Sequence, residues 1–153
     1  MSPTEDNFQK SALSKIINYC NYRDRSTKEI KTKLLDLNYS TEIIDSAISQ
    51  AIELGIVDNF RFSKSFSRGK NQKNRWGKIK IAYELKNKGL NNKEITLGLE
   101  SIEEKTYYKI LMKSIEVYKR KSKKFEKNKL IKHLINKGYE TSLVISTIKK
   151  LNC

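Results

Sequence analysis

Residues 81–90 of the chain read IAYELKNKGL, and close copies of this stretch occur at residues 30–39 (IKTKLLDLNY) and 130–139 (LIKHLINKGY). In every copy two apolar residues lie four positions apart, as Ile81 and Leu85 do, which places them on one face of a helix. The copies are offset by 51 residues (39 to 90) and then 49 residues (90 to 139). A repeat of this size is typical of stacked supersecondary units.

A residue that tolerates a positive φ stands at the same place near the end of each copy: Asn38, Gly89 and Gly138. Such residues adopt, at little steric cost, the left-handed conformation that ends many helices. Each is followed by a residue that can fold back onto the helix: Tyr39, Leu90 and Tyr139. The sequence therefore predicts three equivalent helices with left-handed caps.

The flanking sequence predicts further helices around each copy. Ser26 and Glu29 are spaced as a capping box, in which Glu29 reaches back to the backbone N–H of Ser26. A second helix is expected after Ser40, after Asn91 and near Glu140. The residues expected on its core face are Ile44, Ile48 and Ile52 in the first copy, Ile95 and Leu99 in the second, and Val144 and Ile148 in the third.

Linking helices complete each unit. Asp58 can cap one that carries Phe62 and Phe66, and residues 103–124 predict another. No stretch shows sustained alternation of apolar and polar residues, so no strand is expected. The predicted fold class is all-α, with tandem three-helix units of helix-turn-helix type in an elongated array whose curvature is left open.

The expected division of the chain follows the repeat. Residues 1–18 are an N-terminal segment, residues 19–70 the first repeat and residues 71–124 the second. Residues 125–153 are a third repeat that stops after two helices.

The charge of the chain is unevenly distributed. The 153 residues carry a formal net charge of +15. Residues 1–60 hold 7 Lys and Arg against 9 Asp and Glu, a net charge of −2, whereas residues 61–153 hold 25 against 8, a net charge of +17. This asymmetry indicates a polyanionic partner, either nucleic acid or an acidic protein surface, held mainly by the second part of the chain.

A membrane partner is disfavoured. No run approaches the ~20 apolar residues of a spanning helix, and residues 1–6 lack the basic and apolar regions of a signal peptide. We therefore expect a cytoplasmic protein. In that reducing compartment Cys20 and Cys153 are expected to be thiols.

No pattern of catalytic residues is present in the sequence. We find no glycine-rich phosphate loop, no paired carboxylates and no nucleophile with family spacing. The single histidine, His133, aligns with Lys33 and Glu84 in the repeat and is expected to face solvent. We therefore expect a protein that is not an enzyme and has no catalytic residue, cofactor or metal.

Residues 61–82 are strongly basic and contain no acidic residue. The residues predicted to bind nucleic acid or a filament here are Arg61, Lys64, Arg68, Lys70, Lys73, Arg75 and Lys78. Lys and Arg contact phosphates without reading sequence. The alternative is an exposed linker kept in solution by its charge, and Gly69 and Asn74 predict that the helix gives way to a turn nearby.

A second basic run follows near residue 120. Its predicted binding residues are Lys119, Arg120, Lys121, Lys123 and Lys124. The alternative is a solvated helix end, since cations near a helix C-terminus are favourable by ~0.3–1 kcal/mol without any partner.

Three further residues bear on the interface. Trp76 can stack on a base, but its place beside an apolar helix favours packing in the core. Arg23 and Arg25 lie beside the first capping box, where they form a surface contact or are linker residues, and the second interpretation is narrowly favoured.

Taken in order, these motifs resemble the RecX family. The resemblance rests on residues 23–34 with their S-x-x-E start, on GIVDNFRF at 55–62 and on WGKI at 76–79. It continues with ELKNKGL at 84–90 and LINKGY at 134–139, and covers roughly residues 19–151. The order and spacing of the motifs are more specific than any one of them.

The resemblance implies a regulatory protein of homologous recombination, DNA repair and the SOS response. Such a chain, expected to be a monomer, lies along the groove of a RecA recombinase filament on single-stranded DNA and suppresses its ATPase, growth and strand exchange. Non-specific duplex binding is a further expectation. A third repeat without its last helix would make fewer contacts with the filament. The alternative is a general helical nucleic-acid-binding protein or transcription regulator that does not act on RecA.

Overall fold

The computed structural model describes residues 3–151, which form nine helices and no strand. The helices are α1 (Pro3–Cys20), α2 (Thr27–Asp36), α3 (Thr41–Glu53), α4 (Asn59–Asn74), α5 (Lys78–Asn87), α6 (Asn92–Glu100), α7 (Glu104–Lys121), α8 (Lys127–Asn136) and α9 (Thr141–Lys150). The predicted all-α class is confirmed. Cys153 lies outside the described residues, and Cys20 is a free thiol.

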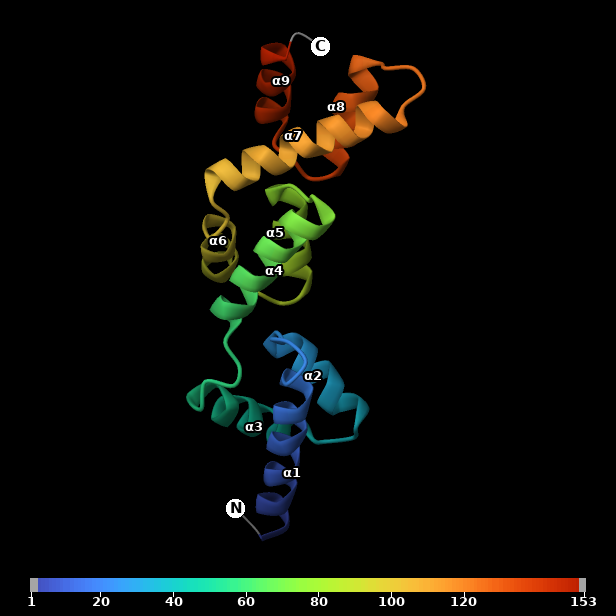
Figure 1. The fold of residues 1–153 in the computed structure, drawn as a ribbon. Coiled ribbons are helices and arrows are strands. Elements are labelled where there is room, and N and C mark those ends of the chain that lie inside the picture. Colours follow the sequence, from blue (N-terminus) through green and yellow to red (C-terminus); the bar gives the residue numbers. More distant parts are fainter. Residues whose placement is uncertain (1–2, 152–153) are drawn as a thin grey trace.

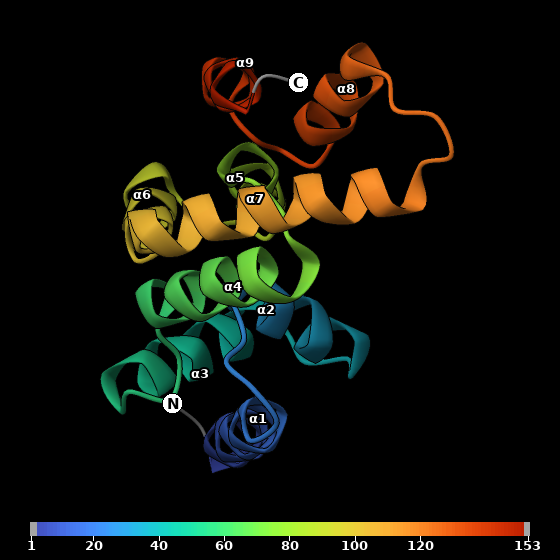
Figure 2. The ribbon, with the colours of Figure 1, turned by 45° about the horizontal axis from the view of Figure 1, so that its top comes forward.

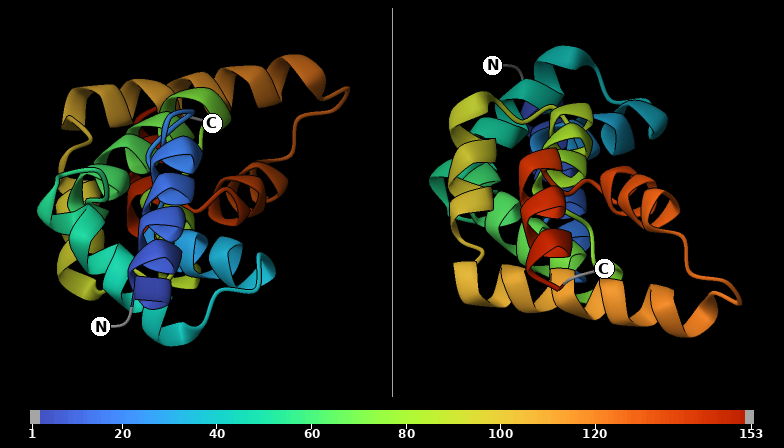
Figure 3. Two further views of the ribbon diagram at one scale, coloured as in Figure 1. Left: turned by 90° about the horizontal axis from the view of Figure 1, so that it is seen from below. Right: turned by 90° about the horizontal axis from the view of Figure 1, so that it is seen from above.

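The helices form three tiers along one elongated body (Figure 1). The first tier holds α1–α3 and the N-terminal end, the second holds α4–α6, and the third holds α7–α9 and the C-terminal end. Viewed along the long axis, the three tiers lie over one another (Figure 3). This arrangement confirms the predicted elongated array.

The predicted left-handed caps are present at all three places. The φ angles of Asn38, Gly89 and Gly138 are 69°, 87° and 99°. The residue after each cap donates its backbone N–H to the carbonyl five positions back, as Tyr139 does to Leu134 at 3.2 Å. Tyr139 is fully buried, so the fold-back contact that the sequence predicts forms part of the core.

The grouping of helices differs from the expected division. Helix α1 packs on α3, and its Ala12 and Ile16 are buried, so residues 3–18 belong to the first tier and not to a separate N-terminal segment. The expected boundaries after residues 18 and 70 fall inside α1 and α4. Each tier therefore begins with its long helix, and the third tier has three helices, α7, α8 and α9, rather than two. Periodicity locates a linking helix but does not say on which neighbour it packs.

The core face of α3 also differs from the prediction. Ile44 is buried as expected, but Ile52 is 50% exposed, and the next core positions are Ala47 and Ala51. Small residues occupy these positions because α1 crosses α3 closely there. In α6 and α9 the expected residues Ile95, Val144 and Ile148 are buried.

Helix α4 continues through Gly69 and ends at Asn74, so the expected turn is present after Asn74 and not at Gly69. One face of this helix is buried through small polar residues: Ser63, Ser67 and Asn71. The close neighbour is α6, where a Cβ on Gly98 would lie 2.8 Å from the Ser63 carbonyl oxygen. The chain leaves the helix at Arg75, whose φ is 56°. The first part of the basic stretch 61–82, up to Asn74, is therefore an ordered helix and not a linker.

The buried apolar residues form two separate clusters. The first, from Ala12 to Val57, lies within the first tier. The second, from Phe62 to Ile148, runs through the second and third tiers without interruption. The first tier therefore has a core of its own, and the other two share one.

The two junctions between tiers differ accordingly. Between the second and third tiers the turns meet through backbone hydrogen bonds, from Gly77 N to Lys137 O at 2.8 Å and from Ile79 N to Gly138 O at 2.9 Å. Between the first and second tiers, Lys28 Nζ donates to Asn87 O at 2.7 Å beside the Gly89 cap. In both places the C-terminus of one repeated helix faces the N-terminus of its predecessor.

Replacing Gly98 with alanine should lower the free energy of unfolding by about 1–3 kcal/mol, since the added methyl group meets backbone atoms of α4 that cannot move aside. A chemical denaturation curve measures this change. Gly69 in α4 is the matched control, because nothing lies within 4 Å of a Cβ there, and alanine should stabilise by about 0.5–1 kcal/mol. Equal effects at the two glycines would contradict the close packing of α4 on α6.

Candidate nucleic-acid interface

Helix α4 divides its predicted binding residues between two sides. Arg61, Lys64 and Arg68 follow a spacing of three and four, which places them along one edge. Lys70 and Lys73 lie on another side of the helix, where they line a cleft. The cations of α4 therefore form two separate stripes on the helix surface, one along this edge and one beside the cleft.

Arg61 is engaged in the junction between the first two tiers. Its Nε lies 3.0 Å from Asp24 Oδ1, and its two terminal nitrogens donate to the carbonyls of Gly55 and Ile56 at 3.1 and 3.0 Å. These contacts fix the segment that leads from α3 into α4. Arg61 therefore has a structural role at this junction, in addition to any partner that it binds.

The cleft beside Lys70 and Lys73 has a volume of about 570 Å³. Two further cations line it: Arg23 from the segment before α2, and Lys88 from the end of α5. Phe66 lies among these cations, with Lys70 Nζ and Lys88 Nζ each 5.5 Å from the centre of its ring. The cleft thus combines several positive charges with an aromatic ring, the two features that bind single-stranded nucleic acid.

Trp76 lies between two lysines at the turn after α4. Lys70 Nζ and Lys80 Nζ are 5.0 and 4.6 Å from the centre of its ring. The indole is half-buried and packs against the larger core cluster. The interpretation of Trp76 as a core residue is therefore confirmed, and its ring also places two ammonium groups.

Arg75 and Lys78 flank the same turn. The Arg75 carbonyl accepts from Tyr139 Oη at 2.9 Å, and the Lys78 N–H donates to Tyr107 Oη at 2.9 Å. Burial raises the pKa of Tyr139 to about 12, so this donor keeps its proton at neutral pH. Both residues therefore join the second tier to the third.

Positive charge also gathers where α8 ends beside this turn. Burial lowers the pKa of Lys137, and the neighbouring charges of Arg75 and Lys80 lower it further. Burial likewise lowers the pKa of His133, with Lys137 and Arg75 adding to the effect. His133 is half-buried against the Tyr118 ring, with centres 4.9 Å apart, so the expectation that it faces solvent is wrong.

The second basic run lies in the third tier at the end of α7. Lys119, Arg120 and Lys121 form its last turn, and Lys123 and Lys124 are exposed in the loop to α8, which stands away from the body (Figure 2). Arg120 lies 4.0 Å from Glu116, and Lys119 Nζ lies 5.2 Å from the Phe125 ring centre. Such exposed contacts contribute little stability. This run is distinct from the cleft.

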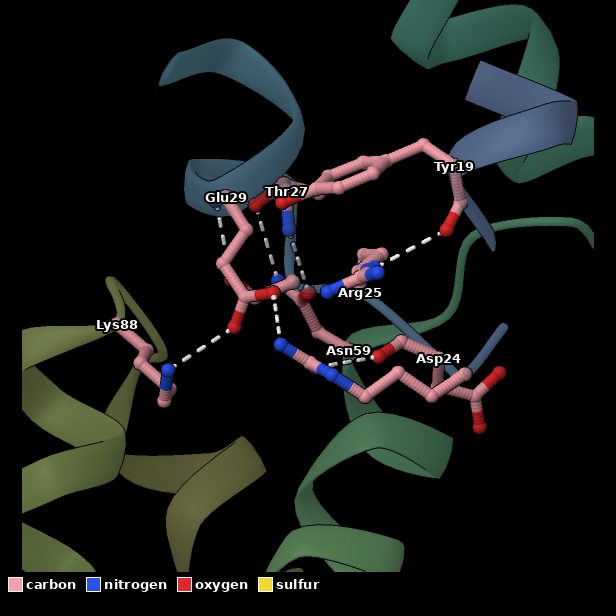
Figure 4. Close-up of polar contacts among 9 residues, drawn as sticks. Tyr19, Asp24, Arg25, Thr27, Glu29, Asn59 and Lys88 are labelled. Atoms are coloured by element: carbon pink, nitrogen blue, oxygen red, sulfur yellow. Dashed lines mark hydrogen bonds and ion pairs between the residues drawn. The ribbon is translucent and has the colours of Figure 1, made fainter. Parts of the chain in front are cut away.

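Glu29 connects the first tier to the cleft (Figure 4). Its carboxylate lies 3.0 Å from Lys88 Nζ and 3.2 Å from an Arg23 terminal nitrogen. The Ser26 side chain accepts from the Glu29 N–H as predicted. The reciprocal half of the expected capping box is wrong, because the Glu29 carboxylate turns to these cations instead.

Sequence reasoning missed Arg23, Lys80, Lys88 and Lys137 as candidate site residues. Arg25 lies in the segment between α1 and α2, as its interpretation as a linker residue predicts, and its guanidinium lies 3.9 Å from the Tyr19 ring centre and donates to the Tyr19 carbonyl (Figure 4). A signal for two of the missed residues is in the repeat. Lys88 and Lys137 each precede the glycine of a left-handed cap, and each reaches back to the tier before it.

Residues 3–151 lack two further kinds of feature. No helix there is both long and apolar enough to cross a membrane. Nor do three His, Cys, Asp or Glu side chains come together in that range in a way that could hold a metal ion.

These features define a class: tandem arrays of three-helix units with a basic surface and a cationic cleft. Two family models match the chain, "RecX, first three-helix domain" at residues 12–50 and "RecX, second three-helix domain" at residues 58–99, and together they span more than half of it. The chain belongs to the RecX family.

Relatives extend the match beyond these two domains. The chain is 32% identical to the regulatory protein RecX of Finegoldia magna over 129 residues, which are 80% of this chain and 63% of that protein. It is 28% identical to the regulatory protein RecX of Chlorobium phaeobacteroides over 152 residues, which are 99% of this chain and 98% of the relative. The family is one of regulatory proteins, in agreement with the expectation that the chain is not an enzyme.

A solved structure has the same fold. The crystal structure of RecX from Lactobacillus salivarius superposes with a TM-score of 0.81 at 21% identity, covering 96% of this chain and 98% of that one. The match includes the third tier, so the three-tier architecture is shared.

Replacing Lys137 with glutamine should raise the pKa of His133 toward its ordinary value, because one of the charges that opposes protonation is removed. NMR titration of the ring protons measures this directly, since the chain has one histidine. Lys149→Gln removes the same charge from α9 and should leave the pKa unchanged. Added salt should act like Lys137→Gln. Identical titrations in the two variants would contradict the cationic cluster.

Proposed function

We propose that this protein binds a filament of the RecA recombinase on single-stranded DNA and modulates it in the inhibitory direction. The observation that carries the proposal is membership in a family of regulatory proteins whose RecA partner the resemblance implies. The fold adds support, since an elongated array of tiers suits a long groove. Its cations suit a surface that exposes phosphates and acidic side chains together.

The charged residues have different parts in this proposal. Lys64 and Arg68 on one edge of α4, and Lys70 and Lys73 in the cleft, contact the filament. Lys121, Lys123 and Lys124 form a second contact at the other end of the array. Because the Arg61 side chain also joins two tiers, its replacement would change both binding and stability. Arg75 and Lys78 join tiers through backbone atoms, which a change of side chain keeps.

Addition of the protein to the cognate recombinase on single-stranded DNA should lower the rate of ATP hydrolysis and shorten the filaments. A coupled ATPase assay and electron microscopy of the same samples measure the two effects. A sample with boiled protein controls for buffer and salt. Unchanged hydrolysis together with unchanged filament length would exclude the proposed function. A duplex operator bound ~10³-fold more tightly than random DNA would instead favour a transcription regulator.

Neutralising Arg68, Lys70 and Lys73 with glutamine should weaken binding to single-stranded DNA of every sequence. The slope of log affinity against log salt should become shallower by about 0.7 for each phosphate that the variant no longer binds. Fluorescence anisotropy across a salt series measures both quantities. The matched variant carries the same three changes at Lys121, Lys123 and Lys124. If that variant abolished binding while the α4 variant left it intact, the central cations would not be the DNA contact.

A further inference from the structure

One position of the repeat is acidic at the junction between the first and second tiers and basic at the junction between the second and third. Glu29 stands one residue before Ile30, and Lys80 stands at the equivalent place before Ile81. At the second junction, Lys137 therefore turns to the Asn74 carbonyl, at 2.9 Å. At the first junction, Lys88 is drawn to Glu29 at 3.0 Å.

This ion pair matters because little else holds the first tier to the second. The two apolar clusters do not merge across the junction. Polar contacts cross it, and besides those of Glu29 they include the Arg61–Asp24 pair and the hydrogen bonds between Thr27 and Asn59. The second junction, in contrast, has a continuous core and direct backbone hydrogen bonds.

Both cations held by Glu29 also line the cleft. Arg23 and Lys88 face the same space as Lys70 and Lys73, beside the ring of Phe66. Asp24, the acid that lines this space, is already paired with Arg61. The cleft therefore has an excess of positive charge, part of which is neutralised by Glu29 from its edge.

The Arg23 contact is the weaker of the two. Glu29 Oε2 is buried and accepts no hydrogen bond, although the Arg23 guanidinium lies 3.2 Å away. Arg23 is 52% exposed, and its guanidinium donates to the Asp24 carbonyl at 2.9 Å, so its side chain can turn toward a phosphate without breaking a hydrogen bond to Glu29. A phosphate that accepts two parallel hydrogen bonds from the guanidinium is a better partner than this carboxylate.

We propose that the cleft is a binding site for the backbone of single-stranded nucleic acid, and that Glu29 is an internal competitor for its cations. A phosphate that takes Arg23 and Lys88 removes them from Glu29 and so loosens the first tier from the second. By reciprocity, release of the Glu29 contacts tightens binding of the strand. Because the site binds phosphates, which carry no sequence information, it is indifferent to sequence. This inference deepens the proposed function and rests on it for the role of the strand.

The first test is Glu29→Gln in the full chain, with Glu53→Gln as the matched control. Glu53 is an exposed acid in α3, so both variants raise the net charge by the same amount. Glu29→Gln should bind a fluorescent oligothymidylate about three- to tenfold more tightly than Glu53→Gln, because two cations are released from ion pairs. Equal affinities for the two variants would overturn the proposal.

A double-mutant cycle of Glu29 and Lys88 distinguishes an effect on binding from an effect on folding if Glu29→Gln destabilises the protein. Lys88→Gln should weaken binding, and adding Glu29→Gln to it should recover much less affinity than in the parent. Lys73→Gln, which changes an exposed residue of α4, should weaken binding without changing the melting temperature. Unaltered affinity in this last variant would show that the strand does not use the cleft.

A distance measurement tests the loosening itself. Spin labels at Ser49→Cys in α3 and Lys93→Cys in α6, with Cys20 and Cys153 replaced by serine, report the separation of the tiers. Oligothymidylate should broaden the distance distribution, and Glu29→Gln should broaden it without any oligonucleotide. A distribution that neither change alters would overturn the coupling.

These assays contain no recombinase, so they separate the cleft from the proposed function. Inhibition of the recombinase ATPase with no effect of Glu29→Gln on oligonucleotide binding would leave the function and exclude the cleft as a nucleic-acid site. If the variant changed only the inhibition, the cleft would bind an acidic protein surface. The converse result, tighter oligonucleotide binding with no inhibition, would leave the cleft and exclude the filament.

Discussion

The head-to-tail stacking of α8, α5 and α2 is the constraint on which the architecture depends. Each of these helices ends in a left-handed cap, and the cap of α8 or α5 lies against the first turn of the helix one tier earlier. The negative end of one helix dipole therefore faces the positive end of the next. A Cβ on Gly77 would lie 2.3 Å from the Gly138 backbone, and one on Gly138 would lie 2.3 Å from Lys80 Cβ, so the second junction requires glycine on both sides. The spacing of the tiers, and with it the positions of their cations, follows from this contact.

The contact between a helix cap and the first turn of the preceding repeated helix is made by different groups at the two junctions. The first and second junctions therefore differ in rigidity. The second junction is closed by backbone hydrogen bonds and a shared core, while the first is closed by long charged side chains. Ion pairs between partly exposed groups are weak and screened by salt, whereas buried apolar area and backbone hydrogen bonds respond little to ionic strength. A polyanionic partner thus meets a molecule whose weakest junction is also its most sensitive to charge.

Much of the fold was predictable because its signals are local. The caps at Asn38, Gly89 and Gly138, the caps at Asp58 and Asn91, and the apolar spacing of four all act within one or two helical turns. The errors arose where distant segments meet. Ile52 carries the periodic pattern of a core residue, yet α1 approaches α3 too closely for it and selects Ala47 and Ala51. Gly69 suggests a turn, yet the packing of Ser63, Ser67 and Asn71 on α6 keeps α4 helical through this residue, and the turn comes only after Asn74.

By itself the sequence determined that the chain is helical, repeated about every fifty residues and positively charged after residue 60. These properties depend on residue type and on short-range spacing. Only the tertiary structure decided which cations act together. It brought Arg23 and Lys88 to the cleft beside Lys70 and Lys73, placed Arg61 in a structural pair and set the α7 lysines apart. Electrostatic interactions depend on distances through space, and a charge count along the chain contains no such distances.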